Sequence, residues 1–125
     1  MNKILRIMVT FVAIIFIVIG LRYAVDPVAA AAQFGMPLLE GVGRSTQIGD
    51  MGAYFLSLGI FILIALSTRR RVWFYPPAII IGLTAVFRVL AWLLHDAALA
   101  TDMIAPEVII TCLLLFAASR LPDKA

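Results

Sequence analysis

The chain is 125 residues long; 64% of its residues are hydrophobic and 14% are charged. This number of polar residues is too small to cover the surface of a water-soluble globule of this size. The composition therefore argues against an ordinary soluble domain and favours the bilayer as solvent. The net charge of +3 comes from basic residues that flank apolar runs, which argues against a nucleic-acid-binding surface.

Four apolar runs are long enough, or nearly so, to cross a membrane as helices. A helix needs about 20 mostly apolar residues to span roughly 30 Å of hydrocarbon. The runs cover residues 4–23, 48–67, 73–94 and 103–121. Little sequence remains for a soluble domain, so we expect residues 1–125 to form a single transmembrane domain, an all-α integral membrane four-helix bundle.

The first run starts within a short basic stretch, Asn2–Arg6, and precedes a series of alanines, as in a secretory signal peptide. The run is longer than the apolar core of a signal peptide, which has about 15 residues at most. We therefore expect it to be a retained membrane helix.

The connection after the first run carries the signals of a short helix. Asp26 is suited to the N-cap and Pro27 to the first helical position, while Gly35 and Pro37 are suited to ending the helix. We expect this helix to lie at the outer surface of the bundle. It would be either a lid over a cavity or a spacer between the first two spans.

Small residues form a track on the second span, at Gly49, Gly52, Ala53 and Gly59. Such tracks let helix backbones approach closely in lipid, where packing rather than hydrophobicity drives association. We expect tight packing against a neighbouring helix, which belongs either to the same chain or to a second copy.

Basic residues are concentrated on one side of the predicted bundle. Seven of the ten Lys and Arg residues lie around the start of the first span, between the second and third, or around the end of the fourth: Lys3, Arg6, Arg69, Arg70, Arg71, Arg120 and Lys124. Because positive charge favours the cytoplasmic side, we expect both termini in the cytoplasm and the first and third loops outside.

An arginine interrupts the third apolar run. Arg88 lies about 7 Å to the outer side of the helix centre, where a cation that faces lipid alone costs on the order of a few kcal/mol. A partner inside the bundle removes this cost, and charged residues at comparable depth are available on the other spans. We therefore expect an outer-leaflet polar cluster of Arg22, Asp50, Arg88 and Glu107.

Helical spacing extends these charges into polar stripes. The stripes are Asp50, Tyr54 and Ser57 on the second span, Thr84, Arg88, Trp92 and His95 on the third, and Glu107 and Thr111 on the fourth. If they face the bundle axis, they line a small pocket that is wetted from outside, with Tyr54 and Trp92 as aromatic walls. The cluster is then either a set of structural ion pairs or a ligand-contacting or catalytic site.

His95 is the single histidine and lies beside Asp96. One histidine without a cysteine pair does not make a zinc site, and no phosphate-binding or dinucleotide motif occurs, so we expect neither a metal nor a cofactor. As a titrating group near the mouth of the cluster, His95 is a candidate acid or base.

The chain also resembles a known family over almost its whole length. The resemblance is carried by "GLRYAVDPVAAAAQFGMP", "GDMGAYFLSLGIFIL", a basic turn, the arginine-bearing third span and the "APEV" start of the fourth. These features are similar to the uncharacterised family called domain of unknown function 4345, small bacterial four-helix membrane proteins related to the DoxX group. The resemblance implies a bacterial inner-membrane protein with no assigned reaction and no known catalytic residues.

Three functions remain open at this point. The first is binding of an amphipathic molecule such as a lipid, quinone or isoprenoid, with Arg88 or Arg22 at its polar head. The second is an enzyme that uses Asp50, Glu107 or His95 as acid or base on a lipid-soluble substrate. The third is a structural or accessory role, with the small-residue track forming a homo-oligomer or docking to a larger membrane complex.

Overall fold

The computed structural model describes residues 1–121, which form helices joined by turns and loops. The elements are α1 (Lys3–Val25), α2 (Pro27–Gln33), α3 (Gly41–Thr68), the 3-10 helix η1 (Arg71–Phe74), α4 (Tyr75–Leu94) and α5 (Thr101–Arg120). The predicted all-α fold with four long apolar helices and a short helix after the first is confirmed. Lys124, which was counted with the basic flank, lies outside the described residues.

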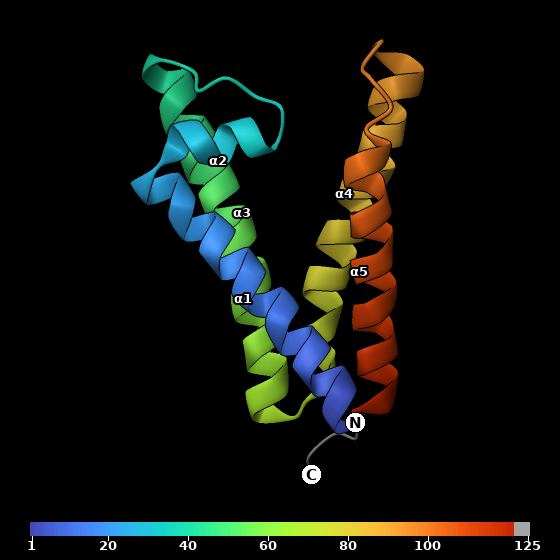
Figure 1. The fold of residues 1–125 in the computed structure, drawn as a ribbon. Helices are drawn as coiled ribbons and strands as arrows, with labels where there is room; N and C mark the ends of the chain where they lie inside the picture. Colours follow the sequence, from blue (N-terminus) through green and yellow to red (C-terminus); the bar gives the residue numbers. More distant parts are fainter. Residues whose placement is uncertain (122–125) are drawn as a thin grey trace.

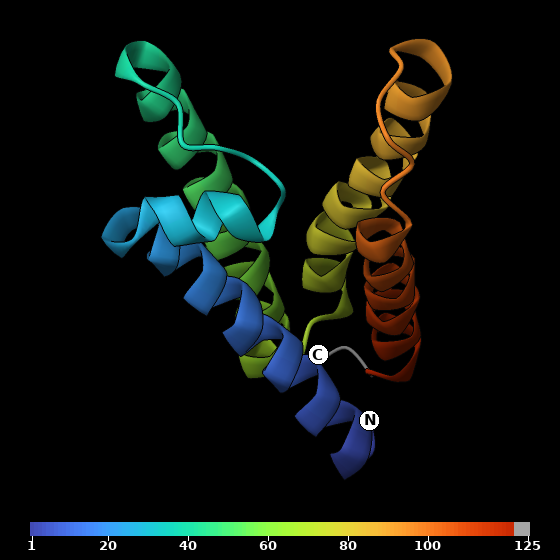
Figure 2. The ribbon, with the colours of Figure 1, turned by 45° about the horizontal axis from the view of Figure 1, so that its top comes forward.

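The four long helices are arranged as two arms of a V (Figure 1). Helix α1 packs along α3, and α4 packs along α5. The arms meet near the N-terminus and η1 and diverge toward the end that carries α2, and Figure 2 shows the same arrangement from a second direction. The hydrophobic core fills the region where the arms converge and continues between α1 and α3 toward α2, where it includes Tyr23, Ala30 and Ala31.

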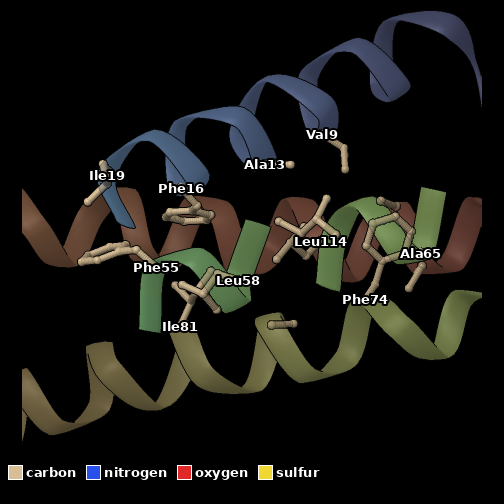
Figure 3. Packing of buried hydrophobic residues seen from close by; sticks show 14 of the residues in the cluster. Val9, Ala13, Phe16, Ile19, Phe55, Leu58, Ala65, Phe74, Ile81 and Leu114 are labelled. Atoms are coloured by element: carbon tan, nitrogen blue, oxygen red, sulfur yellow. The ribbon is translucent and has the colours of Figure 1, made fainter. Parts of the chain in front are cut away.

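Side chains from all four long helices and from η1 build this core (Figure 3). Leu58 of α3 and Ile81 of α4 face each other across the arms and are almost fully buried. Phe74 of η1 and Leu114 of α5 are fully buried in the same cluster. The turn between α3 and α4 is thus part of the core and joins the two arms.

Helices α1 and α3 approach each other closely at glycines. A Cβ atom added at Gly59 would lie 2.7 Å from the carbonyl oxygen of Ala13, and one added at Gly20 would lie 2.7 Å from the backbone nitrogen of Leu56. The small-residue track thus packs against α1 of the same chain at Gly59. Gly49 is different, because no atom beyond its chain neighbours and its own helix backbone lies within 4 Å of the position that its Cβ would take.

The short helix α2 forms as the sequence predicted. Asp26 caps it by accepting a hydrogen bond from the backbone nitrogen of Ala29 at 3.4 Å, Pro27 occupies its first turn, and Gly35 takes a φ of +75° just after its end. Only glycine adopts such a φ without strain.

Helix α3 begins at Gly41 rather than at Ile48, where the apolar run begins. The additional turns contain polar residues, so they lack the apolar character of a span although they are helical. They include Gln47, which is buried and holds the preceding loop: its Oε1 accepts from the Leu39 nitrogen at 2.9 Å and its Nε2 donates to the Pro37 oxygen at 3.1 Å.

Much of the apolar surface of the helices is not covered by protein. Each of the four spans is long and apolar enough to cross a membrane, and at most 33% of its most apolar window is buried within the chain. Large side chains such as Phe11, Phe87 and Ile109 are more than half exposed. Exposed apolar surface of this extent is typical of lipid-facing helices, which points to a multi-pass membrane protein.

The contact of Gly59 with α1 generates a prediction. Gly59→Ala places a methyl group against the backbone of α1, so we expect the free energy of unfolding to fall by about 1–3 kcal/mol, as in other overpacked cores. The measurement is an SDS unfolding titration of the purified protein in mixed micelles. Gly49→Ala is the matched control and should be neutral or slightly stabilising, because the site is open and alanine favours helix. Equal effects of the two substitutions would contradict the close packing.

Candidate functional site

An ion pair between Arg88 and Glu107 connects α4 to α5. The Arg88 Nε lies 3.0 Å from both carboxylate oxygens of Glu107, and the two side chains are 28% and 16% exposed. Arg88 lies about two turns before the end of α4 and Glu107 about two turns after the start of α5, so the antiparallel hairpin brings them to the same level. The predicted inside partner of Arg88 is therefore Glu107.

The geometry of this pair leaves most of the guanidinium unused. In a bidentate arginine–carboxylate pair, two parallel N–H groups each donate to one oxygen. Here one N–H points between both oxygens, and within residues 1–121 no protein group accepts a hydrogen bond from the two terminal amino groups of Arg88. These amino groups are available to a polar group other than the protein.

A second polar contact joins α3 to α4 one turn from Arg88. The Tyr54 hydroxyl lies 2.8 Å from Oγ1 of Thr84, and the same Oγ1 donates to the Ile80 carbonyl at 2.8 Å. Because the threonine hydroxyl has a single proton, the phenol must donate to it. The Tyr54 oxygen is thus left with acceptor capacity only.

The divergence of the arms creates a pocket with a volume of about 280 Å³. Its wall is mostly apolar, with a few polar groups that include the Arg88–Glu107 pair and Tyr54. The lining residues are Ile15, Phe16, Ile19, Gln33, Phe34, Tyr54, Phe55, Ile81, Arg88, Asp102, Met103, Pro106, Glu107 and Ile110. The four long helices all contribute, so the pocket exists only in the folded bundle.

Three aromatic rings surround Phe55 at the pocket. The Phe34 ring stacks on Phe55 with centroids 4.9 Å apart, the Tyr54 ring meets it edge-on at 4.8 Å, and the Phe16 ring lies at 6.0 Å. Such ring contacts are favourable beyond the area they bury. Phe34 directly follows α2, so this contact docks the end of the short helix against α3.

The short helix thereby takes part in the pocket. Gln33, its last residue, and Phe34, which follows it, both line the pocket. Of the two roles open from the sequence, this placement favours a lid over a simple spacer.

Two of the four charged residues in the expected cluster are not brought to the Arg88–Glu107 pair. Nη1 of Arg22 donates to Oε1 of Gln33 at 3.1 Å. Arg22 therefore contacts the last residue of α2 but is not among the residues that line the pocket. Asp50 is exposed on α3 and, within residues 1–121, forms no ion pair with either arginine. Equal depth in the membrane did not imply contact, because the arms diverge at this level.

Two residues of the predicted third-span stripe also lie away from the pocket. Trp92 is 45% exposed and does not line it, so the expected Trp92 wall is absent. His95 is the exposed C-cap of α4. The aromatic walls other than Tyr54 are Phe16, Phe34 and Phe55, which the sequence did not single out because phenylalanines of this chain occupy both exposed positions, such as Phe11, and buried ones.

Comparison with protein-family models, with curated proteins and with solved structures gave no match. The resemblance to the DoxX-related family therefore stays a prediction, and the functional argument rests on the geometry of the pocket.

The ion pair between α4 and α5 generates a prediction of coupling. Arg88→Gln and Glu107→Gln each leave one charge without its partner among apolar side chains, so each should lower the free energy of unfolding by about 1.5–3 kcal/mol. The double variant leaves no charge, and its loss should be smaller than the sum by at least about 1 kcal/mol. The free energies of unfolding of the wild-type protein, the two single variants and the double variant are measured by SDS unfolding titrations.

The control for the cycle is Arg22→Gln. Because the hydrogen bond from Arg22 to Gln33 is exposed, its loss should lower the free energy of unfolding by less than about 0.5 kcal/mol. Strict additivity of the two single losses would show that Arg88 and Glu107 do not interact in the folded protein.

Proposed function

We propose that this chain is a small membrane protein that binds an amphipathic molecule in the pocket between its two arms. The observation that carries the proposal is a mostly apolar pocket whose lining includes an arginine with two terminal amino groups that have no protein partner within residues 1–121. Ligand sites combine a mostly apolar wall with a few polar groups that orient the ligand. The arrangement at Arg88 has this composition.

The position of Arg88 supports binding rather than packing alone. A purely structural pair gains most from the bidentate geometry, which uses two N–H groups of the guanidinium. The Arg88–Glu107 pair uses one, so the terminal amino groups remain for a ligand oxygen. Ionisable residues within membrane spans are costly, and those that persist commonly contact substrates or ions.

The size of the pocket limits the ligand. About 280 Å³ is close to the lower end of the range for ligand sites, roughly 300–1,000 Å³. The pocket therefore holds a polar head and the first part of an apolar chain. Arg88 also borders a shallow groove along α4 with Leu83, Phe87 and Ala91, which offers the rest of the chain an apolar surface.

The proposal includes a location and an orientation. The resemblance to the DoxX-related family supports the bacterial inner membrane, and the distribution of basic residues supports cytoplasmic termini. In this orientation α2 and the pocket face the periplasmic half of the bilayer. Membrane lipids are then both the solvent of the protein and the nearest source of ligands.

A homo-oligomer would have only part of the small-residue track available, Gly49 and Ala53, which are exposed. Gly59 is occupied by α1, and an alanine methyl at Gly52 would be in ordinary contact with Tyr23 of α1. Of the acid–base residues expected for an enzyme, only Glu107 lines the pocket, because Asp50 and His95 lie outside the lining.

A bulky substitution in the pocket tests the proposed binding. We expect Ile110→Trp to fill the pocket and to remove small molecules that the wild-type protein retains from membranes, as measured by native mass spectrometry. Ile109→Trp is the matched control, because this neighbouring residue is 66% exposed and lies outside the lining. The proposal is wrong if the wild-type protein retains nothing, or if both variants retain the same molecules as wild type.

Labelling of single cysteines tests the proposed orientation. Cys112 is the only cysteine, so a Cys112→Ser background gives an unlabelled reference. In intact bacterial spheroplasts, a membrane-impermeant maleimide should label Ala98→Cys, whereas Arg70→Cys should react only after lysis. The reverse pattern would invert the topology.

A further inference from the structure

The polar groups at the pocket differ in what they can still donate or accept. The terminal amino groups of Arg88 and the amide nitrogen of Gln33 are donors without a protein partner in the described part of the chain. The Tyr54 oxygen has only acceptor capacity left. Each carboxylate oxygen of Glu107 shares one N–H and can accept further hydrogen bonds. A ligand head that satisfies this set must both accept and donate.

The charged residues that line the pocket also favour an uncharged ligand head. The charge of Arg88 is already balanced by Glu107, and Asp102 adds a second carboxylate to the lining. Arg22 contacts Gln33 but does not itself line the pocket. An anionic head would therefore bring a negative charge beside Glu107 without meeting an uncompensated cation, and it would offer nothing to the acceptor of Tyr54.

We infer that the pocket selects an amphipathic molecule with an uncharged head that both donates and accepts hydrogen bonds, such as an amide or an alcohol, over a fatty anion. The inference rests on the proposed function and adds the ligand class. The head oxygen accepts from the terminal amino groups of Arg88, while its N–H or O–H donates to Tyr54 or Glu107. The preference depends on Glu107 as the counter-charge of Arg88.

The experiment uses two ten-carbon diazirine probes that differ only in the head, a carboxamide or a carboxylate. The protein is placed in phosphatidylcholine nanodiscs at pH 8, the probe concentration is expressed per lipid, and photolabelling of the peptides that contain Met103 and Ile110 is measured by mass spectrometry. Labelling that persists in Ile110→Trp is subtracted as non-specific.

In the wild-type protein, we expect the carboxamide to label the pocket at about tenfold lower concentration than the carboxylate, the ratio that corresponds to one additional hydrogen bond to a charged group. Glu107→Gln exposes the charge of Arg88, so carboxylate labelling should rise about tenfold. Arg88→Gln should weaken carboxamide labelling and should not improve that of the carboxylate.

The outcomes separate the inference from the proposed function. Wild-type labelling by the carboxylate at equal or lower concentration than the carboxamide overturns the inference while the pocket remains a binding site. An unchanged preference in Glu107→Gln also overturns it. If this variant does not fold, the wild-type ratio decides. If neither probe labels the wild-type pocket above the Ile110→Trp level, the proposed function fails and the inference fails with it.

Discussion

The contact of Arg88 with Glu107 sets the constraint on which the site depends. A guanidinium within an apolar helix must find an internal counter-charge or reach water, and Glu107 on the next helix supplies the counter-charge. The turn between α4 and α5 brings both residues to one level, so the second arm acts as a hairpin held together by an ion pair. Because only the Nε–H is used in this pair, the two terminal amino groups of Arg88, a residue that lines the pocket, have no protein partner within residues 1–121.

The two arms have different sources of cohesion, and this difference explains where the pocket lies. Helices α1 and α3 approach closely because glycines at positions 20 and 59 remove the Cβ atoms that would keep them apart. Helices α4 and α5 are joined by the ion pair near the loop that connects them, and the arms are joined at the opposite end through η1 and Phe74. Where the arms diverge, the Tyr54–Thr84 hydrogen bond still links α3 to α4, and Phe34 after α2 adds a wall to the pocket by stacking on Phe55.

The sequence predicted the elements well because their signals are local. Apolar length marked the four spans, and Asp26, Pro27 and Gly35 marked the short helix through capping and turn preferences that act within a few residues. An internal carboxylate partner for Arg88 could be anticipated, because a cation in an apolar helix requires one, but the sequence left the choice between Asp50 and Glu107 open.

The rest of the site depends on the angle between the arms, which no local signal encodes. Asp50 and Arg22 were expected beside Arg88 because the three residues have similar depths along their helices. Contact also requires the helices to be close at that level, and the α1–α3 arm diverges there from the α4–α5 arm. Trp92 fits the helical stripe of Arg88 yet lies on the exposed side. The role of Phe34 as a pocket wall depends on its stacking on Phe55, which is a contact between the end of α2 and α3 that the sequence does not encode locally.

The most direct test of the account is a measurement of the Arg88–Glu107 contact in lipid bilayers. Solid-state NMR on protein labelled with nitrogen-15 in arginine and carbon-13 in glutamate reports the dipolar coupling between the Arg88 Nε and the Glu107 carboxyl carbon. The account predicts a strong coupling, as for directly bonded partners, that disappears in Glu107→Gln. Absence of this coupling in the wild-type protein, with Arg88 in contact with water or lipid head groups instead, would contradict it.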